Sequence, residues 1–161
     1  MPIPAGGDFE PPLAADPPIW VPTLAQVADH VPYMTVDTVT PGQQQYLNTF
    51  NDLTTPTGVQ AQRLTDGAWP SVAAATGVLA QAVWPLAQHV AALRAAAAIV
   101  RAYPRDDGDL ARAAALDARA DADLLRLIAA NDAAGGGAGN SVDLLPTYSF
   151  PPPAPWGDSL L

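Results

Sequence analysis

Two histidines and several clustered aspartates are the side chains in this sequence that could do chemistry. His30 and His89 lie far apart along the chain, which argues against a histidine-rich metal centre. Asp106, Asp107 and Asp109 cluster within four residues, but a calcium loop needs oxygen ligands at alternate positions and a Glu at its twelfth position. We interpret the cluster as a polar turn before a helix, with Asp109 as the helix cap.

A second conceivable ligand set combines Asp117, Asp121 and His89. The two aspartates lie one helical turn apart, and we interpret them as a solvated helix face. His89 is expected on the polar side of its own helix. The sequence has no nucleophile motif of the G-x-S-x-G type, no phosphate-binding loop and no Cys. We therefore expect no catalytic, cofactor or metal site and no enzymatic activity.

Composition and charge narrow the function further. The 161 residues include 7 Lys plus Arg against 16 Asp plus Glu, which gives a formal net charge of −9. This acidity disfavours a protein that binds nucleic acid through its phosphates or an anionic membrane surface. The absence of Cys excludes a disulfide framework. No targeting segment is visible, and the apolar runs are shorter than the ~20 residues of a membrane span, so we expect a soluble protein.

Eighteen prolines and a glycine-rich run divide the chain into three parts. We expect an irregular, proline-rich arm over 1–22, a helical domain over 23–134, and a Gly-rich hinge with a proline- and aromatic-rich arm over 135–161. The helical domain contains an extended loop over 33–56. A loop of this length is usually functional, and it can pair with a neighbouring subunit rather than fold back on its own chain.

Capping signals and helical periodicity predict an all-α fold, a small bundle with long irregular arms. A capping box of Thr57 and Gln60 begins the second helix, and Pro70 is expected to kink or break it. A short turn joins the last two helices, which are long and should pack antiparallel. The expected helices cover residues 24–31, 58–76, 85–103 and 109–134.

Two apolar seams are expected to join the long helices. One seam recurs with helical spacing on the third helix and the other on the fourth. Trp69 and Trp84 are expected in the core, whereas Trp20 lies in a proline-rich arm with no local core to bury it. The pairing places Val90, Leu93, Ala97 and Val100 against Leu116, Ala120, Leu124 and Leu127.

Arginines and aromatic residues mark candidate interfaces. Arg112, Arg119 and Arg126 recur every seven residues and therefore share one face of the fourth helix. This stripe either keeps the helix soluble or pairs with acids of an adjacent copy, and Asp123 lies within pairing distance of two of its members. In the C-terminal arm, aromatic and apolar side chains stand among prolines and favour burial by a partner. These side chains are Tyr148, Phe150, Trp156, Leu160 and Leu161.

The order of these features carries a resemblance to a known family. A short helix at 22–28 precedes a Thr-rich segment at 35–42 that leads to 46–50. A capped helix then starts at 55–60, and an Ala-rich helix ending at 102–104 is followed by an Asp- and Arg-rich helix. This order resembles the head-to-tail adaptor, or connector, proteins of long-tailed phages that infect actinobacteria. It is similar to the wider portal-associated adaptor family, and the resemblance covers roughly residues 20–134.

The resemblance implies a structural protein of the phage virion, located in the neck between the capsid portal and the tail. During assembly the protein would be in the host cytoplasm. About a dozen copies would form a ring under the portal, extend the DNA channel for genome packaging and ejection, and meet a downstream neck, tail-stopper or tail-terminator protein. DNA would pass without specific binding, through a lumen lined mainly by acids. Tyr46 and Phe50 join the candidate interface residues. The alternative is a small acidic helical binding module or chaperone that pairs with a single protein through its C-terminal tail.

Overall fold

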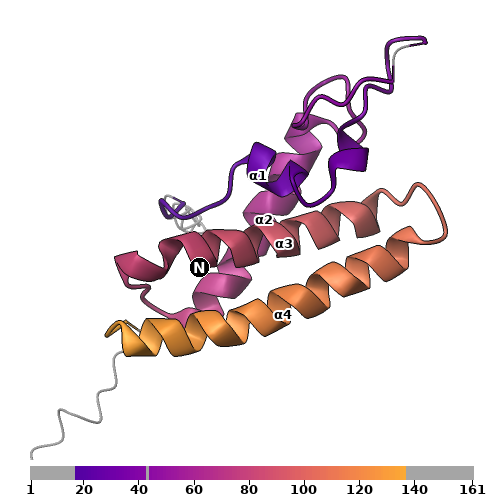
Figure 1. Ribbon diagram of the computed structural model, residues 1–161. Helices are drawn as coiled ribbons and strands as arrows, with labels where there is room; N and C mark the ends of the chain where they lie inside the picture. Colours follow the sequence, from indigo (N-terminus) through magenta and orange to yellow (C-terminus); the bar gives the residue numbers. More distant parts are fainter. Residues whose placement is uncertain (1–16, 43, 137–161) are drawn as a thin grey trace, which may run out of the picture.

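The computed structural model describes residues 17–42 and 44–136 as a helical bundle (Figure 1). Within these residues no β-strand occurs, and the only strand-like pairing is an isolated antiparallel bridge between Val36 and Tyr46. The all-α prediction with four helices is confirmed. The elements are α1 (Leu24–Ala28), η1 (Pro32–Thr35), α2 (Gly58–Thr76), η2 (Gln81–Val83), α3 (Trp84–Ala102) and α4 (Asp109–Ala133), where η denotes a 3₁₀ helix.

The centre of the fold is the antiparallel pair of α3 and α4, which lie side by side while α2 crosses α3 (Figure 1). The predicted seams are confirmed, because all four α3 seam residues are fully buried, as are Ala120 and Leu127 on α4. Leu116 is partly buried against the apolar cluster that contains Val100, and Leu124 against the cluster that contains Val90 and Leu127. A run of buried alanines, Ala95–Ala97, keeps the α3 surface smooth, so neighbouring helices can approach closely.

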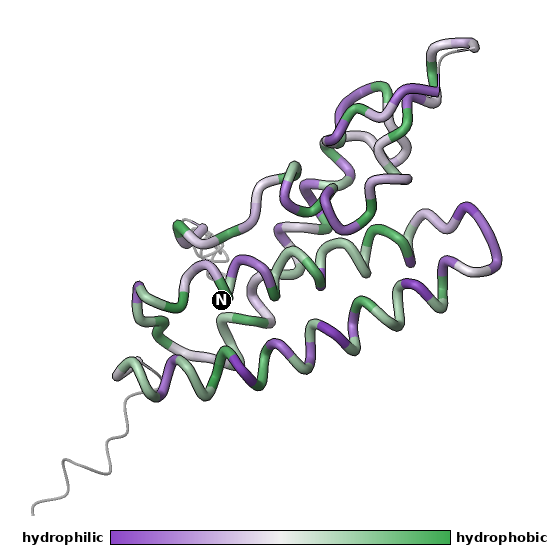
Figure 2. Tube along the Cα trace, in the orientation of Figure 1, coloured by the Kyte–Doolittle hydropathy of each residue, from purple (hydrophilic) through white to green (hydrophobic). Residues whose placement is uncertain are grey.

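The hydropathy of α3 agrees with its central position (Figure 2). By length and composition alone, the stretch Gln81–Ala102 could cross a membrane, which is a longer apolar stretch than the sequence analysis anticipated. However, 61% of its most apolar window is buried inside the bundle. A core helix of a folded bundle meets the same length and composition test, so the stretch is accounted for by packing.

The second helix forms as its sequence signals predict, except at its proline. Thr57 and Gln60 make both bonds of the capping box. The helix runs through Pro70 without a break, so of the two expected outcomes, a kink or a break, the break does not occur. Pro70 and Asp66, whose carbonyl loses its helical partner, are both exposed residues, so water can satisfy that carbonyl.

The first helix is shorter than predicted, ending at Ala28 rather than at residue 31. Pro32 explains the difference, because a residue that precedes proline is pushed out of the α region. Val31 accordingly has φ −139° and ψ 54°, and Pro32 starts the 3₁₀ helix η1. Val27 and Val31 are still buried, so the predicted apolar face reaches the core without a continuous helix.

Both ends of the loop over 33–56 pack on the core of their own chain, although the sequence analysis expected the loop to pair with a neighbour instead. Met34 is fully buried and Phe50 is 4% exposed, and both pack in one apolar cluster with α1 and α3. Phe50 therefore does not lie on a surface, where an interface residue would have to be. Gly58 lets the start of α2 approach the backbone at Phe50 closely, because a Cβ atom at position 58 would lie 3.0 Å from the Phe50 carbonyl oxygen.

Trp20 also belongs to the core rather than to an unattached arm. It is 7% exposed and meets the Trp69 ring edge-on, with centroids 6.1 Å apart. Trp69 and Trp84 are partly buried in the same cluster, as predicted. The bundle therefore starts before residue 22, and residues 1–16 of the predicted arm lie outside the described part of the chain.

A candidate interaction surface at the α3–α4 turn

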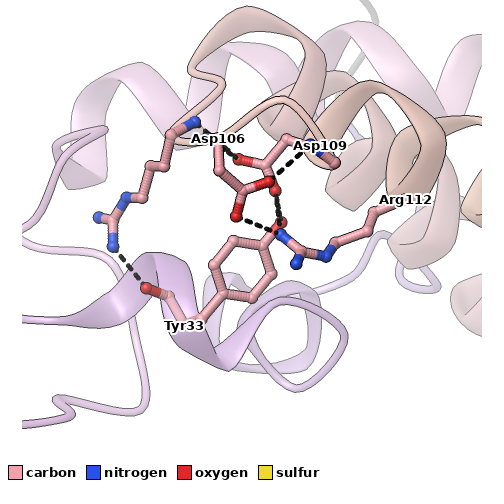
Figure 3. Close-up of polar contacts among 6 residues, drawn as sticks. Tyr33, Asp106, Asp109 and Arg112 are labelled. Carbon is pink, nitrogen blue, oxygen red and sulfur yellow. Dashed lines mark hydrogen bonds and ion pairs between the residues drawn. The ribbon is translucent and has the colours of Figure 1, made fainter.

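The turn between α3 and α4 is built around a buried carboxylate (Figure 3). The side chain of Asp109 is fully buried and accepts a hydrogen bond from the Tyr33 hydroxyl at 2.9 Å. It also accepts from the backbone N–H groups of Arg105 at 2.6 Å and Asp106 at 3.3 Å. Arg112 donates to it at 2.7 Å. The bonds from Tyr33, Arg105 and Asp106 join α4 to the η1 segment and to the turn, whereas the bond from Arg112 lies within α4.

Asp109 is therefore not the helix cap that the sequence predicted. Gly108 occupies the N-cap position of α4 and has no side chain to bond the helix N–H groups. The Asp109 carboxylate instead binds the N–H groups of the preceding turn, above all that of Arg105, and these bonds lower its pKa to about 2. Burial and the bond to this carboxylate together raise the pKa of Tyr33 to about 12.

Arg105 clamps the loop over 33–56 to the same turn. Its guanidinium donates to the carbonyl oxygens of Tyr33 at 2.5 Å, Met34 at 3.2 Å and Thr55 at 2.9 Å. One side chain thus binds both ends of the loop. Nothing in the sequence marks Arg105 for this role, because its partners are at least 50 positions away along the chain.

The clamped loop carries a projecting hairpin, described over residues 36–42 and 44–46, which extends away from the bundle (Figure 1). The bridge between Val36 and Tyr46 closes its base. The Asp37 carboxylate accepts from the N–H groups of Val39 and Thr40, which fixes the turn. Val39 is 61% exposed and Tyr46 is 58% exposed. Tyr46 is therefore placed where an interface residue is needed.

The three arginines of the predicted stripe are exposed on α4 and have carboxylate partners within the chain. Arg126 bonds Asp123 at 2.8 Å, and Arg119 lies 3.9 Å from the same carboxylate. Both predicted pairs with Asp123 are confirmed. Arg112 bonds Asp106 as well as Asp109, and its guanidinium lies 5.3 Å from the centroid of the Tyr33 ring (Figure 3).

Asp121 is exposed, as the interpretation of a solvated helix face predicts, and Asp117 is partly buried; both carboxylates have arginine partners. Asp121 pairs with Arg94 at 2.9 Å, and Asp117 pairs with Arg101. Both arginines belong to α3, so these ion pairs lie across the α3–α4 contact. Such partly exposed pairs contribute little stability individually.

The structure brings the two histidines together, which the sequence did not predict. The rings of His30 and His89 lie with centroids 5.2 Å apart beside a cavity of about 230 Å³. His89 Nε2 is 3.5 Å from Asp123 Oδ2, so this histidine faces α4 rather than open solvent. In the described ranges no group of three or more His, Cys, Asp or Glu residues could hold a metal ion.

From this histidine pair we expect the free energy of unfolding to depend on pH. Burial, then the neighbouring His89 and Arg119, lower the pKa of His30 below 6.5, while Asp29 opposes the shift. Because the unfolded chain binds the proton more tightly, the stabilisation is complete above about pH 6.5 and is lost as the pH falls from there through the lower folded-state pKa. We expect urea unfolding of the wild type to lose more stability between pH 7.5 and 5.5 than that of His30→Gln. Equal losses would contradict the assignment.

The remaining candidate interface residues, Tyr148, Phe150, Trp156, Leu160 and Leu161, lie outside the residues that the structure describes. Comparison with known proteins adds no relative, since no family model, no curated protein and no solved structure matches this chain. The functional assignment therefore depends on the sequence pattern and on the geometry of the chain itself.

Proposed function

We propose that this protein is a structural head-to-tail connector of a long-tailed phage. In this role, copies of the chain form a ring beneath the portal, extend the DNA channel, and bind the next neck or tail protein. The proposal assigns the protein no catalytic step and no cofactor. Its site of action is the neck of the virion.

The single observation that favours this function most is the clamped hairpin over 36–46. A projecting segment with exposed Val39 and Tyr46 is held in place by the chain's own Arg105 and Asp109. A segment that is already ordered loses less conformational entropy when it binds a neighbour. A rigid helical body with a pre-ordered projecting loop is well suited to repeated contacts between identical subunits.

Two further properties support the same function. The order of capped helix, Thr-rich loop and antiparallel helix pair is the order on which the resemblance to phage adaptors rests. The net charge of −9 suits a channel wall that must let DNA slide without holding it. We expect acids rather than the arginines of α4 to line the lumen of the ring.

Removal of the C-terminal arm gives the first functional test. We expect a chain ending at Gly136 to keep the helix content and the melting temperature of the full chain within a few degrees, because the described core lies before that residue. We expect it to lose at least tenfold in affinity for portal, measured by co-sedimentation. Normal affinity would show that the arm is dispensable, and an unfolded product would place its aromatics in the chain's own core.

Point variants of the full chain show whether binding to portal depends on the aromatic side chains of the arm or only on the length of the arm. A triple variant, Tyr148→Ala, Phe150→Ala and Trp156→Ala, should reproduce the loss. The matched control changes three small polar residues of the same arm, Ser141→Ala, Ser149→Ala and Ser159→Ala, and should bind portal normally. Equal binding by the two triple variants would count against the aromatic anchors.

A further inference from the structure

A groove lies between the segment that follows α1 and the outer face of α4. Val31, Leu116 and Ala115 form its apolar lining, and its volume is about 330 Å³. Tyr33 and His30 add aromatic surface, and Arg112 and Arg119 also line the groove. No carboxylate is among the residues that line it. The groove therefore combines apolar and aromatic surface with two cationic side chains.

Arg119, one of the two arginines that line the groove, has N–H donors that can bind a further acceptor. Arg112 already binds Asp106 and Asp109, whereas the nearest carboxylate to Arg119 is 3.9 Å away and is shared with Arg126. A guanidinium offers five N–H donors, and the Arg119 side chain is 63% exposed. An acidic group entering the groove would find a partner there.

The chain's own C-terminal segment has the complementary composition. Residues 137–161 contain two acids, Asp143 and Asp158, and no Lys, Arg or His. Within them Phe150 to Trp156 reads FPPPAPW, and Asp158 follows two residues later. Proline-rich segments with this character bind grooves lined by aromatic side chains, because a polyproline conformation loses little entropy on docking.

The connecting residues are long enough for such an arrangement. The α4 residues that line the groove lie in the first half of the helix, and Gly136 follows its opposite end. From Leu116 to Gly136 the distance is about 30 Å at the rise of a helix. The residues from Gly136 to Phe150 span about 43 Å in an extended polyproline conformation. A segment that is tethered by a flexible linker also has an effective concentration at the groove on the order of 1 mM.

We infer that residues 150–158 of the unassembled chain dock in this groove of the same molecule. The prolines and Trp156 lie against Tyr33 and Leu116, and Asp158 meets Arg119. The contact keeps the arm's aromatic side chains covered until a partner competes for them. This inference does not depend on the proposed function, because it concerns the chain alone.

A paramagnetic label on the full chain tests the inference directly. Since the chain has no Cys, Ser159→Cys gives a single attachment point for a nitroxide. We expect the label to broaden the amide signals of residues 30–33 and 112–119 in its own ¹⁵N-labelled chain. In a dilute mixture of ¹⁵N-labelled chain without nitroxide and unlabelled chain with nitroxide, we expect no broadening. Broadening in the mixture would mean docking between copies and would overturn the inference, as would its absence from both samples.

Two substitutions on α4 provide a matched pair for the same experiment. Ala115 lines the groove and Ala114 does not, and both residues are exposed. Ala115→Glu places a carboxylate one turn from both Arg112 and Arg119, so it should abolish the broadening. Ala114→Glu should preserve it. Circular dichroism should show equal helix content for both variants, and broadening that persists in Ala115→Glu would overturn the inference.

Discussion

Replacing Leu93 by Asp is expected to destabilise the chain by about 4 kcal/mol, a large share of the roughly 5–15 kcal/mol that stabilises a folded domain. Leu93 is fully buried in the middle of α3, where its side chain has no access to water. The substitution removes apolar contacts and leaves a carboxylate that must either be buried without a partner or drive the helices apart. Urea unfolding followed by circular dichroism measures the loss.

The matched control makes the same chemical change on the outside of the bundle. Leu125 is 70% exposed on α4, so Leu125→Asp should change stability by less than about 1 kcal/mol. If both variants unfold at the same urea concentration as the wild type, α3 and α4 do not pack through the seam described above.

Replacing Asp109 by Ala is expected to cost about 3 kcal/mol. The substitution leaves the Tyr33 hydroxyl and the backbone N–H groups of Arg105 and Asp106 without their acceptor. Because those bonds hold η1 against the turn, we expect the hairpin over 36–46 to lose its hydrogen-exchange protection together with the turn. Asp107→Ala, an exposed neighbour in the same turn, is the control and should have almost no effect.

Acid titration tests the same carboxylate without a large structural change. The folded-state pKa of Asp109 is about 2, below its ordinary 3.8, so its contribution is complete above about pH 4. The contribution is lost as the pH falls from about 4 towards 2. Asp109→Asn should lack this component of the pH dependence. A wild type and an Asn variant with parallel stability curves over that range would contradict the assigned bonds.

The parts of the fold that the sequence predicted depend on interactions between residues close in the chain. Thr57 and Gln60 satisfy each other three residues apart, so their capping box could be read directly. The apolar residues of the α3 seam repeat every three or four positions. The turn between α3 and α4 is short, which favours antiparallel packing of the two helices. These local signals located α2, α3 and α4 to within one residue at each end.

The parts that sequence analysis missed depend on contacts between distant residues. Arg105 binds the carbonyl of Thr55, and carbonyl groups carry no sequence signal. Trp20 was placed in an arm because its neighbours are prolines, yet its partner Trp69 comes from another helix. His30 and His89 meet only because α1 packs against α3. No periodicity or cap could have revealed these three contacts.

The two candidate interface residues of the loop over 33–56 have different surroundings in the structure. Tyr46 lies at the base of the polar hairpin and is exposed, which agrees with its predicted place at an interface. Phe50, only four residues later, is drawn into the core by α1 and α3. The sequence indicated an aromatic-bearing loop but could not show which aromatic would face inward, since the loop has no regular period.

Native mass spectrometry of the purified chain mixed with the portal protein of its proposed phage source, with negative-stain images of the same sample, tests the proposed function most directly. The proposal predicts a closed ring of about a dozen copies stacked on the portal. A complex of one copy with a single partner molecule, or a chain that stays monomeric with portal in excess, would contradict it and favour a small helical binding module.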